Sequence, residues 1–254
     1  MAVPGRIVGD LRRFLARTGS GPGARREARD GLRRRLADEL RPQARMWLSV
    51  HIPKTAGLTF SLVLAEVFRR DLYRSYWEIT DCQGRVVPDF PGNARCIHGH
   101  IDLGRLVPAY PDATLVTWVR DPVQRVASLY HYWRREPDWR HSLCRKLHQE
   151  NLSLLAFARQ EPARNEMTRF FGGFGPPDFH FIGLFEQLAE SMDVFFRRFG
   201  LPRMPVAHGH RNPDRGAGGY ALPAEDRAEI AGLNEEDVRL YEACARRFAR
   251  ERAA

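Results

Sequence analysis

The segment "LSVHIPKTAGLTFSLVLAEVF", Leu48–Phe68, decides how this chain folds. It begins with an apolar run typical of a buried strand, passes through a short polar turn, and continues with apolar residues at helical spacing. Lys54 and Thr55 lie in the turn. Backbone N–H groups and the helix dipole favour an anion at such a turn, and Lys54 adds a full positive charge. The segment therefore predicts an α/β fold with a phosphate-binding loop.

The composition allows a sizeable core and favours an anionic partner. The chain has 254 residues, 43% of them hydrophobic, and a formal net charge of +9. A basic protein of this kind binds nucleic acid, phosphorylated cofactors, acidic polysaccharide or membrane surfaces. Among the 40 basic residues, however, only Lys54 and Lys146 are lysine. This bias is typical of a GC-rich genome, so the charge alone says little, whereas a lysine at the loop stands out.

Cysteine spacing and hydropathy indicate the compartment. Cys82, Cys96, Cys144 and Cys244 show neither a CxxC pair nor zinc-ligand spacing. We expect free thiols in a reducing compartment, with a single disulfide left open. No apolar run reaches the roughly 18 residues of a membrane span, and the N-terminal stretch lacks the apolar core of a signal peptide. The prediction is a cytoplasmic protein without a bound metal.

The chain divides near residue 45. Residues 1–45 are rich in arginine, contain a glycine-rich break at Gly19–Gly23, and show apolar residues at helical spacing on both sides of it. We predict a basic helical extension over 1–45 and the main domain over 46–254. The preferred interpretation of the extension is two solvated helices packed on the domain. The alternative is an arm that binds a partner or a membrane surface.

Strand and helix patterns alternate from Met46 onward. Such alternation predicts a mainly parallel sheet with helices on both faces, a P-loop-like fold of three layers. The expected strands cover 46–52, 94–100, 113–119 and 178–184, and the expected helices 59–70, 122–135, 187–200 and 235–251.

The loop fails the signature of nucleotide triphosphatases. Their pattern G-x-x-x-x-G-K-[ST] needs a glycine before the lysine, whereas here Gly57 follows it. "HIPKTAGLTF" instead resembles the 5′-phosphosulfate loop, P-K-T-[AG]-G-[ST]-[ST]-[FL], of sulfotransferases that use PAPS (3′-phosphoadenosine 5′-phosphosulfate). The branch with heparan-sulfate 2-O- and 6-O-sulfotransferases and bacterial relatives is the most similar. The alternative is a plain strand-to-helix turn with an exposed lysine.

The resemblance implies a set of residues around the 5′-phosphosulfate. One of them, Leu58, departs from the family pattern, which has Thr or Ser there, and this removes one expected hydroxyl contact. The implied set is Lys54, Thr55, Ala56, Gly57, Leu58, Thr59 and Phe60.

A second motif, "RDPVQRVASLY" at Arg120–Tyr130, follows the third predicted strand. It resembles the family's 3′-phosphate site, R-D-P-x-x-R-x-x-S-x-[YF], at every fixed position. The resemblance implies that Arg120 and Ser128 bind the 3′-phosphate, whereas we expect Arg125 to support the helix. Taken alone, the segment is a helix start capped by Asp-Pro. The order of the two motifs, one strand apart, favours the family.

Two histidines end the second predicted strand in "HGHIDLG". One interpretation is that they are an ordinary pair of core or surface histidines without a catalytic role. The related 2-O-sulfotransferases share the H-G-H segment, and this likeness implies that His100 is the general base and His98 a helper or substrate contact. A neutral imidazole suits removal of a proton from an alcohol at physiological pH.

Weaker similarity continues downstream. "NEMTRFFGG" at residues 165–173 resembles a family segment beside the nucleotide and the acceptor, and "HRNPD" at 210–214 resembles a loop that closes near the cofactor. The likeness implies that Arg211, or Arg215, reaches the 3′-phosphate. We expect residues 71–92 and 133–149 to face the acceptor.

The function implied is sulfuryl transfer from PAPS to an acceptor hydroxyl, with a carbohydrate as the expected acceptor. Trp77, Trp133 and Trp139 are candidates for stacking on a sugar. A kinase-like phosphotransferase is one alternative, but it needs a glycine-lysine loop and a carboxylate for magnesium. A non-catalytic basic protein that binds nucleotides or nucleic acid is another, but it leaves the ordered motifs unexplained. We therefore expect no nucleic-acid partner, and the oligomeric state stays open.

Overall fold

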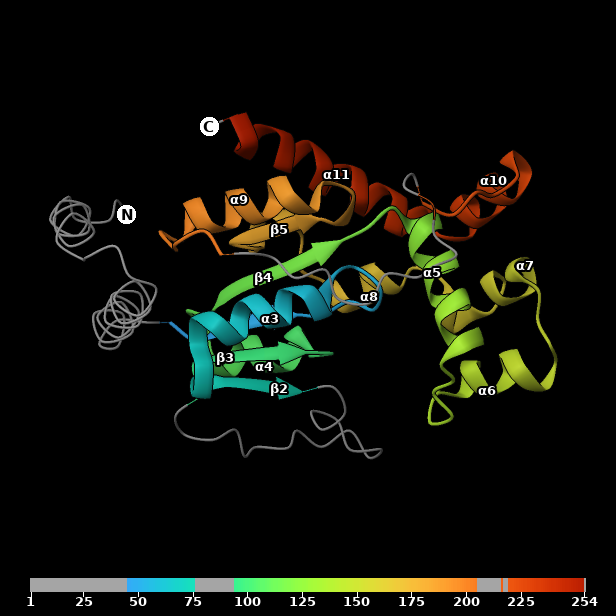
Figure 1. Ribbon diagram of the computed structural model, residues 1–254, viewed down its shortest axis with the longest axis horizontal. Coiled ribbons are helices and arrows are strands. Elements are labelled where there is room, and N and C mark those ends of the chain that lie inside the picture. Colours follow the sequence, from blue (N-terminus) through green and yellow to red (C-terminus); the bar gives the residue numbers. More distant parts are fainter. Residues whose placement is uncertain (1–44, 76–93, 205–215, 217–218, 254) are drawn as a thin grey trace, which may run out of the picture. The chain divides into compact units, whose positions relative to one another are not determined.

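The computed structural model describes residues 45–75, 94–204, 216 and 219–253 (Figure 1). The predicted extension, apart from Arg45, lies outside these residues, so the division of the chain at residue 45 stays a prediction. Trp77, Cys82, Arg211 and the segment 210–214 also lie outside them.

A five-stranded parallel sheet forms the centre of the described part. Its order is β2-β3-β1-β4-β5, and every neighbouring pair of these strands is parallel. The strands are β1 (Trp47–Val50), β2 (Leu72–Ser75), β3 (Cys96–Gly99), β4 (Thr114–Val119) and β5 (Phe181–Leu184).

Four of these strands confirm the predicted ones, and β2 was not predicted. "LYRS" is only four residues long, and Leu72 is its one aliphatic side chain, followed by Tyr, Arg and Ser. It pairs with β3 alone, at the edge of the sheet. A short edge strand lacks the apolar run that marks a central parallel strand, so its sequence signal is weak.

The predicted helices are confirmed, and shorter ones join them. The expected helices are α3 (Gly57–Phe68), α5 (Pro122–Arg135), α9 (Leu188–Arg198) and α11 (Glu235–Ala253). The additional ones are α4 (Leu103–Ala109), α6 (Ser142–Gln149), α7 (Leu154–Ala158), α8 (Glu166–Phe171) and α10 (Ala224–Leu233). Single 3-10 turns lie at Arg69–Asp71, Glu161–Ala163, Pro176–Asp178 and Phe185–Gln187.

Helices α3 and α4 cover opposite faces of the sheet. The connection from β1 through α3 to β2 runs toward one edge, whereas the connection from β3 through α4 to β4 runs toward the other. Because crossovers between parallel strands are right-handed, connections in opposite directions place their helices on opposite faces. Figure 1 shows α3 in front of the sheet and α4 behind it. The fold is therefore the predicted α/β arrangement of three layers.

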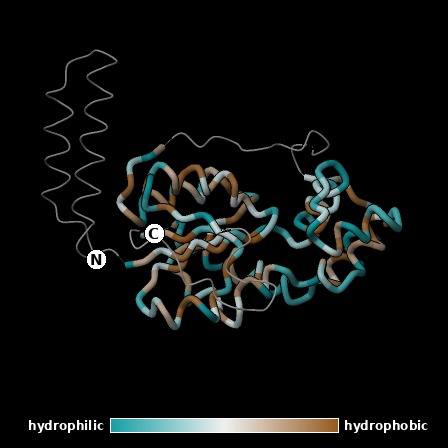
Figure 2. The backbone as a smooth tube through the Cα atoms, turned by 90° about the horizontal axis from the view of Figure 1, so that it is seen from below, coloured by the Kyte–Doolittle hydropathy of each residue, from teal (hydrophilic) through white to brown (hydrophobic). Residues whose placement is uncertain are grey.

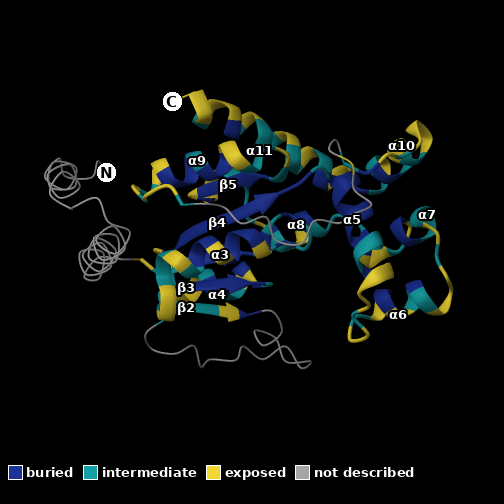
Figure 3. Ribbon diagram, in the orientation of Figure 1, coloured by how far each residue is buried: buried dark blue, intermediate teal, exposed yellow. Residues whose placement is uncertain are grey.

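Aromatic side chains fill the core between α3, α9 and the sheet. The Phe60 ring of α3 lies 5.5 Å from Trp118 of β4 and 5.0 Å from Phe195 of α9, centroid to centroid. Trp118 lies over Gly183 of β5, where a Cβ atom would fall 2.4 Å from the indole ring. Figure 3 shows the strands of this region as mostly buried. Burial of these large rings supplies much of the hydrophobic stabilisation that holds α3 in place.

A second, smaller core joins α5, α6, α7 and α10, which we call the helical wing. Its buried residues include Val126, Leu143, Leu147, Phe157 and Ile230. Figure 2 shows hydrophobic residues in the sheet region and in this wing alike. Helix α5 begins at the sheet, where Asp121 accepts a hydrogen bond from the Gln124 N–H at 2.8 Å, and then continues into the wing.

The strand order defines where a ligand would bind. The carboxyl ends of all five strands lie at the same end of the sheet because the strands are parallel. The chain leaves β1 toward one side of the sheet and leaves β4 toward the other, although β1 and β4 are neighbours. Open α/β sheets bind ligands at such a switch point. Lys54 follows β1 and Arg120 follows β4, so both predicted motifs lie there.

Candidate functional site

The loop after β1 is tightly curled around Thr55. The Thr55 hydroxyl donates to the Ile52 carbonyl oxygen at 2.8 Å, and its side chain is fully buried. Lys54 and Ala56 on either side have φ angles of 69° and 89°, in the left-handed region that residues with a Cβ rarely occupy. Such strain persists where the surrounding structure enforces it, which is common at ligand-binding loops. The Thr55 proton is used to hold the shape of the loop, with Lys54 at its tip.

The first turn of α3 divides its residues between surface and core. Leu58 is 46% exposed, Thr59 is buried, and Phe60 is fully buried against Trp118. The Phe60 N–H donates to the Ala56 carbonyl at 3.0 Å. Phe60 therefore anchors the helix, and the part of this turn nearest the loop is Gly57 to Thr59. Nothing in the structure explains why Leu58 occupies its position.

Lys54 lies between the loop and the helical wing. Its Nζ atom is 3.8 Å from the centroid of the Tyr132 ring on α5, a cation–π contact. Burial, and next the charge of Arg120, lower the pKa of Lys54 to about 8. At neutral pH most of the molecules therefore carry an ammonium here, and a bound anion would stabilise that charge further.

Arg120 joins the two motifs directly. Its Nη1 atom donates to the Lys54 carbonyl oxygen at 3.1 Å, and its guanidinium lies 4.2 Å from the Phe185 ring centroid. The residue is only 2% exposed. A buried guanidinium held in this way is pre-organised for an anion, since little side-chain freedom is left to lose.

Ser128 lies on the same face of α5 as Gln124 and Tyr132, and Tyr132 contacts Lys54. Gln124, Ser128 and Tyr132 are four residues apart and so share one helix face. Tyr132 contacts Lys54, and Gln124 holds Tyr220 through hydrogen bonds of 3.0 and 2.7 Å. Ser128, itself buried, lies between them in the row. The structure thus brings the face of α5 that carries Ser128 to the loop that carries Lys54.

The two predicted histidines differ in depth. His98 is 1% exposed, its Nδ1 lies 2.9 Å from the Ser49 hydroxyl, and burial lowers its pKa to about 3. His100 is partly exposed, and burial, with a smaller effect of His141, lowers its pKa to about 4. Both rings are therefore neutral at physiological pH, the form that accepts a proton. Of the two residues, His100 is the more exposed, although its Nε2 atom is itself enclosed.

A third histidine, His51, completes the group and was missed by the sequence reasoning. Its ring stacks on that of His98 at 5.3 Å with an interplanar angle of 11°, and lies 5.1 Å from that of His100. The signal was the parallel register. Val50 pairs with Gly99, and the His51 N–H donates to the Gly99 carbonyl at 2.7 Å, which sets His51 beside His100. Register is a property of the pairing and cannot be read from either strand alone.

Two further residues of the predicted segments, Arg125 and Thr168, bind other parts of the protein rather than facing the site. Arg125 is fully buried, forms an ion pair with Glu166 and donates from Nη2 to the Ala163 carbonyl at 2.8 Å. These contacts join α5 to α8 and to the Glu161–Ala163 turn. Thr168 of the "NEMTRFFGG" segment donates to Asp237 on α11 from both its N–H and its hydroxyl, each at 2.8 Å.

The segments expected to face an acceptor are described in part. Trp133 is buried in the core of the wing, whereas Trp139 is 57% exposed. His141, at the start of α6, is near enough to His100 to lower its pKa, and its own ring lies 4.6 Å from that of Trp133. The wing therefore approaches the histidine group from the side of α6.

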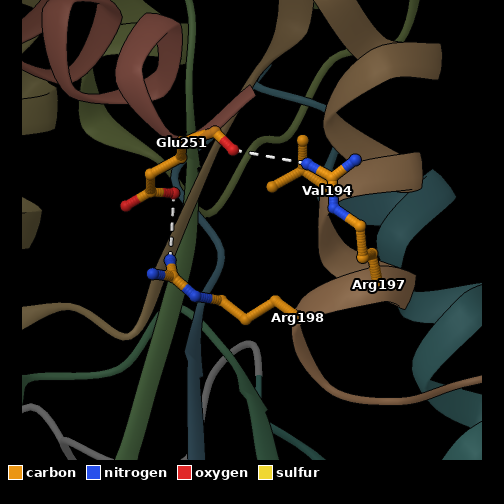
Figure 4. A pocket seen from close by; sticks show the side chains of 4 residues that line it. All are labelled: Val194, Arg197, Arg198 and Glu251. Carbon is orange, nitrogen blue, oxygen red and sulfur yellow. Dashed lines mark hydrogen bonds and ion pairs between the residues drawn. The ribbon is translucent and has the colours of Figure 1, made fainter. Parts of the chain in front are cut away.

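A separate hollow of about 220 Å³ lies away from this site, lined by Val194, Arg197, Arg198 and Glu251 (Figure 4). Arg198 donates to the carbonyl of His180, which precedes β5. This hydrogen bond therefore lies at the amino ends of the strands, whereas the switch point lies at their carboxyl ends. It also pairs with Glu251 at 2.9 Å, and Arg197 donates to the Glu251 carbonyl at 3.3 Å. These contacts tie α11 to α9, and we assign the hollow no role in the chemistry.

Neither a metal cluster nor a membrane span is evident in the described part of the chain. No group of three or more His, Cys, Asp or Glu side chains there is arranged to hold a metal ion. None of the helices in the same ranges combines the length and the hydropathy needed to cross a bilayer. The described cysteines, Cys96, Cys144 and Cys244, are free thiols.

Comparisons with known proteins show a distant likeness to solved structures. No protein-family model matches the chain, and neither does any curated protein. A structure titled "Crystal Structure of Sulfotransferase from Alicyclobacillus acidocaldarius" is similar over 79% of this chain and 95% of its own, with 17% sequence identity and a TM-score of 0.45. Similarity at this level does not establish a family, so the assignment of the site rests on its own residues and geometry.

Proposed function

We propose that this protein is a PAPS-dependent O-sulfotransferase that transfers a sulfuryl group to a hydroxyl of a carbohydrate. The observation that carries the proposal is the junction of the two sequence motifs at the switch point, where Arg120 donates to the backbone of Lys54. Each motif resembles one half of a PAPS site, and the two halves meet where open α/β sheets bind ligands.

The residues present suit the two anionic ends of PAPS. The Lys54 ammonium and the first turn of α3 would hold the 5′-phosphosulfate, because both favour negative charge. Arg120 and Ser128 would hold the 3′-phosphate, for which a guanidinium fork and a hydroxyl are suitable donors. Two cationic side chains close enough for the charge of one to lower the pKa of the other are stabilised by an anionic ligand.

The acceptor hydroxyl would be activated by His100. Its neutral ring takes the hydroxyl proton while the oxygen attacks sulfur, and the bond between sulfur and the bridging 5′-phosphate oxygen breaks. Lys54 stabilises the charge that develops on that oxygen. The products are the sulfated acceptor, adenosine 3′,5′-bisphosphate and a proton on His100. His98, held by Ser49 and nearly inaccessible, stacks on His51, which lies beside the His100 ring, so it takes the helper role rather than touching the acceptor.

A carbohydrate acceptor is favoured by the branch that the motifs resemble. The exposed Trp139 on the wing offers an aromatic surface of the kind that stacks on a sugar ring. Its neighbour His141 connects this part of the wing to His100. These residues support an acceptor that lies between the wing and the carboxyl end of β3.

The proposal is tested by incubating the protein with labelled PAPS and a panel of glycans, and detecting an added sulfate by mass spectrometry. We expect transfer in the wild type and its near-complete loss in Lys54→Ala. His100→Ala should lose turnover while binding adenosine 3′,5′-bisphosphate normally in calorimetry. Loss of turnover in His98→Ala but not in His100→Ala would refute the assignment of the base. Failure of the wild type to bind the bisphosphate would refute the whole proposal.

A further inference from the structure

His51 occupies the space between the loop and the histidine at the end of β3. Its ring stacks on His98 and lies 5.1 Å from His100. Its backbone N–H extends the pairing of β1 with β3 by bonding to Gly99. The family patterns that the two motifs resemble assign no role to His51, although its ring lies against both the phosphosulfate loop and His100.

Gly57 shows how closely the His51 ring approaches the loop. A Cβ atom at Gly57 would fall 1.7 Å from Cδ2 and 2.0 Å from Nε2 of His51. Gly57 is the first residue of α3, and its φ angle is not in the left-handed region, so close approach rather than backbone conformation requires glycine here. The ring of His51 therefore lies directly against the start of the helix.

The environment keeps this ring uncharged. Burial lowers the pKa of His51 well below its usual value, and a proton on His98 or His100 and the charge of Lys54 act in the same direction. Arg74 of β2 acts on His98, and His141 of α6 acts on His100 in the same sense. Among the residues that the structure describes, the charges named here as acting on the three rings are basic, so a proton on one ring disfavours a proton on the next.

We propose that His51 is a positioning residue that sets the separation between the phosphosulfate loop and His100 and holds the His100 ring in place. The ring contacts Gly57 on one side and the two histidines of β3 on the other, so its removal would open a space between donor and base. The catalytic part of this inference rests on the proposed function. The structural part is testable without turnover.

The test compares three variants with the wild type. His51→Ala empties the space, His51→Phe fills it without ring nitrogens, and Gly57→Ala pushes the His51 ring away with every site side chain retained. Gly232→Ala is the matched control, because a Cβ there meets nothing within 4 Å. For each variant, NMR titration follows His100, calorimetry measures adenosine 3′,5′-bisphosphate binding, and sulfate transfer yields kcat and KM.

We expect His51→Ala and Gly57→Ala to lower kcat by roughly 10- to 100-fold, since a misplacement of about 1 Å has effects of that size. Binding of the bisphosphate by His51→Ala should change less than about threefold, which corresponds to well under 1 kcal/mol. Water entering the vacated space should raise the pKa of His100 toward its ordinary value, so activity on the acid side should be lost at a higher pH. His51→Phe should retain more activity than His51→Ala.

Three results would overturn the proposal. One is a His51→Ala variant with the kcat and the His100 titration of the wild type. Another is loss of bisphosphate binding with an unchanged His100 titration, which would assign His51 to the loop alone. The third is a His51→Phe variant no better than His51→Ala. If the wild type transfers no sulfate, the proposed function fails, but the NMR titration still decides whether His51 positions His100.

Discussion

Lys54 loses its charge closer to neutral pH than an ordinary lysine does. Its pKa is lowered to about 8, first by burial and then by Arg120. The Tyr132 ring and the curl of the loop hold the ammonium at the site in the absence of a ligand. The charge on which anion binding would depend is therefore partly lost just above physiological pH.

We predict that adenosine 3′,5′-bisphosphate binds more weakly as the pH rises above about 8. Protonated Lys54 binds the anion, so above its pKa each binding event must take up a proton, and the affinity falls by up to about tenfold per pH unit. The phosphates of the ligand, with a second pKa of about 6, do not titrate in this range. Calorimetry between about pH 7 and pH 9.5 measures the effect.

Lys54→Arg is the control for this prediction. A guanidinium keeps its proton over the whole range, so the affinity of this variant should not depend on pH. A wild-type affinity that is constant between about pH 7 and pH 9.5, or a decline of the same size in Lys54→Arg, would show that Lys54 does not contribute its charge to binding.

Arg120 should decide whether the protein recognises a 3′-phosphate. The wild type should prefer adenosine 3′,5′-bisphosphate over adenosine 5′-monophosphate. Arg120→Ala should lose most of that preference, about 10- to 100-fold, since a hydrogen bond to a charged group is worth about 1.5–3 kcal/mol. Competition calorimetry with the two nucleotides gives the ratio. Equal weakening for both nucleotides would mean that Arg120 supports the loop through Lys54 and does not read the 3′-phosphate.

At the scale of elements, α8 depends on a carboxylate from another helix. Asp237, near the start of α11, accepts from the Met167 N–H at 3.1 Å and from the N–H and hydroxyl of Thr168 at 2.8 Å each. The carboxylate thus caps the six-residue helix α8. It accepts from N–H groups of the first turn, which have no acceptor within the helix. Phe170 of this helix lies 5.7 Å from His100, so the cap also fixes one wall of the histidine group.

We predict that Asp237→Ala lowers the free energy of unfolding by about 2–4 kcal/mol, because the buried Met167 N–H and the partly buried donors of Thr168 lose a charged acceptor. Thr168→Val, which removes only the side-chain donor, should cost about 1 kcal/mol. Urea unfolding followed by circular dichroism measures both. A change below about 0.5 kcal/mol for Asp237→Ala would show that solvent replaces the cap.

At the scale of the whole molecule, residues 46–254 contain both hydrophobic cores. One core surrounds the sheet, and the other lies within the helical wing. A unit with its own cores is expected to fold alone. We predict that a chain beginning at Met46 unfolds within about 2 °C of the full chain and binds adenosine 3′,5′-bisphosphate within about twofold. Scanning calorimetry and titration calorimetry test this. Loss of cooperative unfolding would assign residues 1–45 to the domain.

Much of the fold could be predicted from local sequence patterns. The apolar strand before "HIPKTAGLTF" and the helical spacing after it required a strand, a loop and a helix in that order, and Asp121-Pro122 marked the start of α5. These signals are local, because neighbours in the sequence determine turns, caps and periodicity. The edge strand β2 and the short helix α8 gave no such signal, because pairing and capping partners distant in sequence hold them.

The amino-acid sequence by itself determined the α/β class, the two motifs and the residue types available for chemistry, since each depends on spacing within a few residues. Only the tertiary structure decided how those residues meet. The parallel register set His51 beside His100, and the strand order placed Arg120 against Lys54. Burial then distinguished the partly exposed residue His100 from the fully buried His98. These outcomes depend on contacts between segments about 50 to 70 residues apart, which arise only when the strands pair.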